Sequence, residues 1–173
     1  MDATISRQIV HVPADGVVLE GAVEAPPGAR GVIVFAHGSG SSRVSPRNRY
    51  VAAQLRRSAF ATLLFDLLNQ QEDGDAAARF DIALLARRLR GAVEWARERP
   101  ELRGLPVGLF GASTGAAAAI EVGAALGEGV SAVVSRGGRP DLASDIALRK
   151  LSAPTLLIVG GDDAEVIELN EAA

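Results

Sequence analysis

Short, continuous apolar runs alternate with stretches of helical periodicity along this chain. Runs without polar alternation are typical of strands that are covered on both faces. The runs that predict such strands are residues 31–36, 60–65, 107–110, 130–135 and 155–159. The stretches that predict helices are residues 46–58, 75–99, 114–126 and 141–151. This order predicts an α/β fold, with a mostly parallel sheet and helices on both of its faces.

The chain enters this sheet through a predicted antiparallel hairpin. Residues 8–12 and 17–23 read as strands, and Pro13-Ala14-Asp15-Gly16 between them is a turn signal. At the other end, residues 164–173 have the pattern of the opening turns of an amphipathic helix. No internal repeat or low-complexity tract divides the sequence, so we expect a single domain over residues 1–173.

Composition narrows the range of partners. The 173 residues are 48% hydrophobic with a net charge of -3, and 18 basic residues are scattered among 21 acidic ones. Such a mixture produces little long-range field, which argues against nucleic acid and membrane partners. The sequence has no cysteine, which excludes disulfides and a thiol nucleophile. We expect a cytoplasmic protein that binds a small molecule and needs no metal or cofactor.

The strongest chemical signal is Gly111-Ala112-Ser113-Thr114-Gly115, between a predicted strand and an alanine-rich predicted helix. A sharp strand-to-helix turn presents a nucleophilic serine, and it needs small residues on either side. A structural turn in which Ser113 merely caps the helix is the alternative. The glycine spacing does not fit a dinucleotide fingerprint, and the turn lacks the lysine of a phosphate-binding loop.

A second small-residue loop, His37-Gly38-Ser39-Gly40-Ser41-Ser42, follows the predicted strand at residues 31–36. It therefore lies at the carboxyl end of a central strand, where α/β sheets bind ligands. Backbone N–H groups of Ser39 and Thr114 could together form an oxyanion hole. The alternative is a flexible connection without a catalytic role.

These two motifs, with the late segment Pro154–Asp163, resemble the dienelactone hydrolase-like branch of the α/β-hydrolase superfamily over nearly the whole chain. The resemblance implies a serine hydrolase of small carboxylic esters or lactones. It also implies that Asp163, or the neighbouring Asp162, is the acid that orients a histidine base.

The resemblance further implies a catalytic histidine after the acid, in the order Ser, Asp, His. The only histidines are His11 and His37, both far upstream, and His37 is expected to be a structural hydrogen-bonding residue of its loop. We therefore expect the sequence to be truncated at its C-terminus, without the last strand and helix of the fold. The chain alone is then expected to be almost inactive.

Substrate and partners are less constrained. Asp66, Arg136 and Arg139 follow predicted strands at the expected active edge, where an arginine could hold a substrate carboxylate or fix a loop through an ion pair. Relatives of this kind are sometimes fused to a phosphoribosyltransferase domain. An exposed final strand would also permit a homodimer. A non-catalytic binding protein on the same fold is the alternative function.

Overall fold

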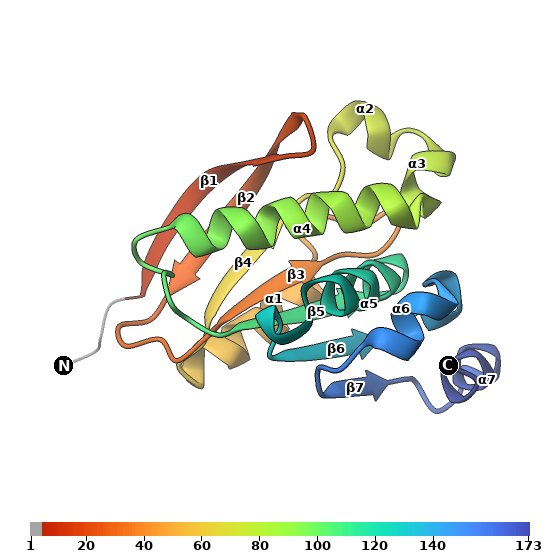
Figure 1. Cartoon of the computed structure of the whole chain (residues 1–173). Helices are drawn as coiled ribbons and strands as arrows, with labels where there is room; N and C mark the ends of the chain where they lie inside the picture. The colour runs from red at the N-terminus through yellow and green to blue at the C-terminus, as the bar shows by residue number, and fades with distance from the viewer. Residues whose placement is uncertain (1–4) are drawn as a thin grey trace.

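The computed structural model describes residues 5–173, and its elements follow the predicted alternation (Figure 1). The strands are β1 (Ser6–Ala14), β2 (Val17–Ala25), β3 (Val32–Ala36), β4 (Ala61–Phe65), β5 (Val107–Ala112), β6 (Ala132–Arg136) and β7 (Thr155–Ile158). The α-helices are α1 (Pro46–Arg57), α2 (Gln70–Asp73), α3 (Ala76–Phe80), α4 (Ile82–Glu98), α5 (Thr114–Leu126), α6 (Asp145–Lys150) and α7 (Ala164–Glu171). Two short 3-10 helices are η1 (Gly127–Gly129) and η2 (Pro140–Leu142).

All seven strands form one sheet in the order β1-β2-β4-β3-β5-β6-β7. The pairs β1/β2 and β2/β4 are antiparallel, whereas β3, β4, β5, β6 and β7 run parallel to one another. The α/β class and the N-terminal antiparallel hairpin are therefore confirmed. Because the parallel strands share one direction, the loops that follow β3, β5, β6 and β7 all meet at the same edge of the sheet.

The hairpin is longer than the sequence predicted, because its turn is tighter. Asp15 and Gly16 form a two-residue connection with φ of 45° and 80°. Two positive φ values in succession match the right-handed twist of the flanking strands, and Asp-Gly is a favoured pair for this turn. Pro13 and Ala14 consequently belong to β1 rather than to the turn.

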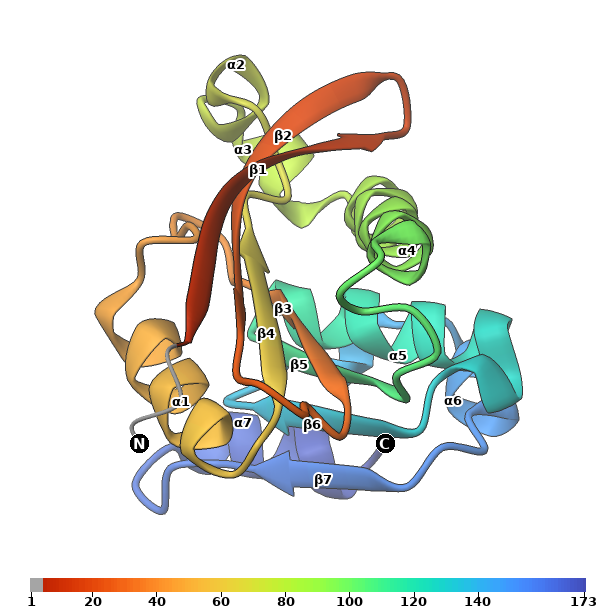
Figure 2. The same ribbon diagram turned by 90° about the vertical axis from the view of Figure 1, so that its left-hand side faces the viewer.

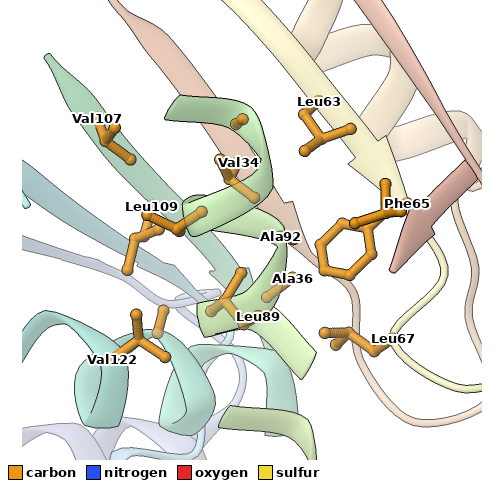
Figure 3. Close-up of a cluster of buried hydrophobic side chains, with 14 of the residues drawn as sticks. Val34, Ala36, Leu63, Phe65, Leu67, Leu89, Ala92, Val107, Leu109 and Val122 are labelled. Carbon is orange, nitrogen blue, oxygen red and sulfur yellow. The ribbon is translucent and has the colours of Figure 1, made fainter. Parts of the chain in front are cut away.

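Helices cover the two faces of the sheet in separate layers. Figure 2 shows α4 and α5 on one face and α1 on the other. The larger core lies between the sheet and the helices α4 and α5, and it includes Val34, Phe65, Leu89 and Val122 (Figure 3). On the opposite face, Ala52 of α1 packs with the neighbouring side chains of β3, β4 and β5. This double burial explains why the inner strands are continuously apolar.

Two predicted helices are each interrupted, which corrects the expectation from the sequence. In place of one helix over residues 75–99, α3 ends and α4 begins at Asp81, whose carboxylate accepts a hydrogen bond from Leu84 N at 2.9 Å. Similarly, the predicted helix at residues 141–151 is η2 followed by α6, with Ser144 as the N-cap. Aspartate and serine bind nearby backbone N–H groups, and this competes with continuation of a helix.

Candidate active site

Ser113 occupies the tight turn between β5 and α5. Its backbone has φ 51° and ψ -123°, a left-handed conformation that non-glycine residues adopt at a cost. Glycines make the turn possible: a Cβ added to Gly115 would overlap the carbonyl oxygens of Ala36 and His37. The predicted sharp turn is present, and the serine side chain does not cap α5.

The loop after β3 packs directly against this turn. A Cβ placed on Gly38 would lie 2.9 Å from the Ser113 Cβ, so only glycine fits there without a shift. Ser39 N donates a hydrogen bond to Thr114 Oγ1 at 3.1 Å. The structure thus brings together the two residues whose N–H groups the sequence proposed as oxyanion donors, although 75 positions separate them.

His37 holds the loop in place from its buried position. Leu67 N donates to Nε2 at 2.9 Å, so Nε2 must carry a lone pair, and Nδ1–H then donates to Gly38 O at 2.9 Å. Burial lowers the pKa of His37 and favours this neutral form. Both ring nitrogens are engaged, which agrees with the expected structural role.

Asp163, the predicted acid, follows β7 and is the N-cap of α7. Its carboxylate accepts a hydrogen bond from Val166 N at 3.3 Å, and it is exposed, as is the neighbouring Asp162. Because β5, β6 and β7 are parallel, this loop lies at the same sheet edge as Ser113. The predicted acid and nucleophile therefore share an edge, and no hydrogen bond joins them.

Arg136 ends β6 opposite Ala112, the residue before Ser113. Its Nη2 donates to Asn48 Oδ1 at 3.1 Å, and its Nε is buried without a partner among the described residues. Burial, together with repulsion from Arg47, lowers the pKa of Arg136. The site therefore contains an arginine that no carboxylate of the described chain neutralises.

The other two predicted binding residues are engaged in ion pairs. The Arg139 guanidinium donates two hydrogen bonds to the Asp141 carboxylate, from Nε at 2.8 Å and from Nη2 at 2.7 Å. The Arg139 backbone N donates to Ser113 O at 3.2 Å. Asp66 accepts from Arg43 N at 2.7 Å and from Arg43 Nη1 at 2.8 Å. The Arg139–Asp141 pair matches the loop-fixing alternative, whereas Asp66 pairs with Arg43, which the sequence analysis did not consider.

The sequence did not identify Arg43 and Asn48 as site residues. Arg43 joins Asp66 to Glu20 and so lines a cavity of about 420 Å³ beside His37. Asn48 is a buried polar residue of α1, and its side-chain oxygen accepts the hydrogen bond from Arg136. Asn48 lies four positions before the buried Ala52, on the same face of α1. A polar residue on the core-facing side of a predicted helix was the signal that could have identified Asn48 as a site residue.

Within residues 5–173, no group of three or more acidic or histidine side chains is arranged to hold a metal ion. No described helix is both long enough and apolar enough to cross a bilayer.

The parallel sheet, its antiparallel hairpin and the serine turn between β5 and α5 define a protein with the α/β-hydrolase fold. A dienelactone hydrolase from Anabaena variabilis is 53% identical, and the alignment covers 97% of this chain and 79% of that one with a TM-score of 0.92. The chain therefore belongs to the dienelactone hydrolase family. No family model matches the chain.

More distant structures agree in fold alone. The dienelactone hydrolase-like promiscuous phosphotriesterase P91, from metagenomic libraries, is 19% identical, covers 97% of this chain and 75% of its own, and has a TM-score of 0.76. The Butyrivibrio proteoclasticus protein Est1E is 14% identical, covers 88% and 77%, and has a TM-score of 0.71.

Two curated Mycobacterium tuberculosis proteins, from strains H37Rv and CDC 1551, are each 54% identical over 172 residues. Both carry the provisional name phosphoribosyl transferase. The match covers 99% of this chain and 39% of each relative, so the chain spans well under half of their length.

Proposed function

We propose that the protein containing this chain is a serine hydrolase of small carboxylic esters or lactones, with Ser113 as its nucleophile. The observation that carries the proposal is the strained turn at Ser113, packed against a loop whose Ser39 lies within hydrogen-bond distance of Thr114. A non-glycine residue with positive φ is rare, and such strain is concentrated at functional sites. The dienelactone hydrolase that is 53% identical to this chain adds support.

In the proposed reaction, Ser113 Oγ forms a bond to the carbonyl carbon of the ester while its proton passes to a general base. The carbonyl π electrons move to oxygen, and the N–H groups of Ser39 and Thr114 stabilise the resulting oxyanion. Collapse restores the carbonyl and breaks the ester C–O bond, and the departing alcohol takes the proton from the base. Water then repeats the sequence and releases the acid from Ser113.

The base itself is proposed to come from outside these 173 residues. His37 uses both ring nitrogens in the loop, and His11 is exposed on β1, separated from β5 in the sheet by β2, β4 and β3. Asp163, or Asp162, would orient the incoming histidine. The matched Mycobacterium tuberculosis proteins extend well beyond the aligned residues, which leaves room for such a segment.

Substrate preference is proposed to depend on Arg136 more than on Arg139 or Asp66. The Arg139 guanidinium already binds Asp141, and Asp66 already binds Arg43, whereas Arg136 has only the Asn48 amide. A half-buried cation whose Nε is buried, and which has no carboxylate partner among the described residues, favours an anionic ligand. We therefore propose that esters carrying a carboxylate are among the substrates.

Two further proposals concern a fused partner domain and a function without catalysis. The provisional name of the long relatives supports fusion to a phosphoribosyltransferase domain. The engagement of both ring nitrogens of His37 favours the alternative that this chain by itself is a small-molecule binding module. The two candidates differ in whether Ser113 performs turnover.

The test compares hydrolysis of p-nitrophenyl acetate by the product of the complete reading frame with hydrolysis by residues 1–173 alone. We expect turnover by the complete product that requires Ser113, and almost none by the shorter chain. Turnover by the shorter chain at a similar rate would contradict an external base. If neither protein shows turnover that depends on Ser113, the binding module replaces the hydrolase.

A further inference from the structure

The side chain of Thr114, as well as its backbone N–H, lies at the candidate site. Its side chain is buried, with 1% of the residue exposed, and its Oγ1 accepts the hydrogen bond from Ser39 N at 3.1 Å. The N–H group expected to stabilise an oxyanion is therefore already paired with a side chain in this structure. A buried N–H without any partner would be costly, so this pairing stabilises the ligand-free loop.

Among residues 5–173, the hydrogen bonds of this hydroxyl comprise the one that it accepts from Ser39 N and none that it donates. Threonine inside a helix can donate to the carbonyl four residues earlier, but Thr114 is the first residue of α5. The residue four positions earlier is Phe110, which lies in β5 and pairs with Val134 of β6. A hydroxyl that accepts one bond keeps a donor free, and this donor is attached to the residue next to Ser113.

The backbone around Thr114 is closely packed. Gly115 is packed against the carbonyl oxygens of Ala36 and His37, and Gly38 lies against Ser113 with no room for a side chain. The loop and the first turn of α5 therefore cannot separate without breaking these contacts. A β-branched side chain held between them has few rotamers, which favours a preorganised donor.

We propose that the Thr114 hydroxyl is a third donor of the oxyanion hole. In the ligand-free site it accepts from Ser39 N; when the oxyanion forms, Oγ1–H donates to it beside the two backbone N–H groups. Charge develops on that oxygen as the carbonyl π electrons move to it, and no proton is transferred in this step. The inference rests on the proposed hydrolase function.

Thr114→Val and Thr114→Ser test the proposal in the product of the complete reading frame. Valine keeps the shape and removes the hydroxyl, whereas serine keeps the hydroxyl and removes the methyl group. For p-nitrophenyl acetate we expect Thr114→Val to lower kcat by about 10- to 100-fold with KM nearly unchanged, because an oxyanion donor acts on the transition state. Thr114→Ser should stay within about fivefold of the wild type.

Thr62→Val is the matched control. Thr62 is another fully buried threonine, on β4, and its hydroxyl accepts a bond from Arg56 Nη1 at 3.1 Å. Its replacement should lower the melting temperature and leave kcat unchanged. If Thr114→Val does not fold, Thr114→Ala replaces it with the same expectation for kcat.

Three outcomes would overturn the proposal. A kcat of the hydroxyl-free variant at or above that of the wild type would mean that the hydroxyl competes with the oxyanion for Ser39 N–H. Equal losses in the serine and hydroxyl-free variants would assign the effect to packing of the methyl group. If Ser113 of the wild-type protein does not react with a fluorophosphonate, both the proposed hydrolase function and this inference are wrong. If Ser113 reacts and Thr114→Val shows no loss of kcat, only the inference about Thr114 is wrong.

Discussion

Two loops at the same sheet edge differ sharply in how they are held. The turn at Ser113 is enclosed: Gly38 and Gly115 have no space for a Cβ, and Thr114 is almost fully buried. The loop between β7 and α7 is open: every residue of β7 is exposed, and a Cβ on Gly161 would meet nothing within 4 Å. Ser113 and Thr114 are thus held by close packing, whereas Asp163, the proposed acid, follows a strand whose residues are all exposed.

For the proposed hydrolase, this contrast means that the chain fixes the two halves of the site unequally. Preorganised donors and a strained nucleophile are useful only when packing fixes them, because a shift of about 1 Å can cost about 100-fold in rate. In the proposed mechanism Asp163 acts through a histidine, so the segment that carries this histidine would complete the position of the acid.

Ser113→Ala should have the largest effect on turnover. Removal of the nucleophile from the product of the complete reading frame should lower kcat for p-nitrophenyl acetate by about 10⁶-fold, the order observed for a catalytic serine elsewhere. Steady-state kinetics measures this loss. Melting temperature serves as the control, and it should change little because the Ser113 side chain makes no cap bond.

Asp163→Asn should reduce kcat by about 10⁴-fold, since an amide no longer favours the correct tautomer of the base. Asp162→Asn is the matched variant one position earlier, and it should stay within about threefold of the wild type. A comparison of pH–rate profiles for the two variants measures the effect. The reverse order of effects would assign the acid role to Asp162.

Gly115→Ala should destabilise the fold by about 4 kcal/mol or more, because the new methyl group overlaps the backbone oxygens of Ala36 and His37. Gly161→Ala in the open loop should change stability by less than about 0.5 kcal/mol. Urea denaturation of both variants in the 173-residue chain measures the difference. Similar losses would show that the two loops are equally constrained.

Arg136→Ala should raise KM for esters that carry a carboxylate by about tenfold and leave neutral esters nearly unchanged, because a bidentate charged contact is lost. Arg139→Ala is the paired control, since its guanidinium is already bound to Asp141. Kinetics with a matched acidic and neutral ester measures the selectivity. An equal loss on both esters would refute the carboxylate contact.

His37 should make stability depend on pH. Its folded pKa lies below 6.5, so below pH 6.5 the unfolded chain binds a proton that the folded chain does not. The free energy of unfolding should therefore fall as pH decreases below 6.5, by at most about 1.4 kcal/mol per pH unit, until the folded pKa is reached. Urea titrations at several pH values should show this slope in the wild type.

The matched variants for this slope are His37→Gln and His11→Gln. The first should lose the slope near pH 6, and the second should keep it because His11 is exposed on β1. Retention of the slope in His37→Gln would assign the dependence to other groups.

Much of the fold was predictable because the inner strands are buried on both faces, and continuous apolar runs therefore marked β3, β4 and β5. The break at Asp81 was missed because helical periodicity continues across it. The Asp81 backbone leaves the helical conformation, with ψ 86°, and its carboxylate caps α4 through Leu84 N. The length of the hairpin was also missed, because the turn needed only Asp15 and Gly16.

The candidate site was predictable where local rules apply. A sharp turn at Ser113 requires small neighbours, and the sequence contains them. The position of two loops at one sheet edge also indicated that Ser39 and Thr114 lie together, although 75 positions separate them. The contact of Arg136 with Asn48, across 88 positions, was not predicted. The ion pair that engages Asp66 involves Arg43, and tertiary packing alone brings these side chains together.

The most direct measurement is the reaction of the complete reading-frame product with a fluorophosphonate, followed by mass spectrometry of the peptides. We predict one adduct, on Ser113, formed much more slowly in Asp163→Asn. An adduct on another serine, or none on a folded protein, would contradict the claim that the enclosed turn presents a nucleophile.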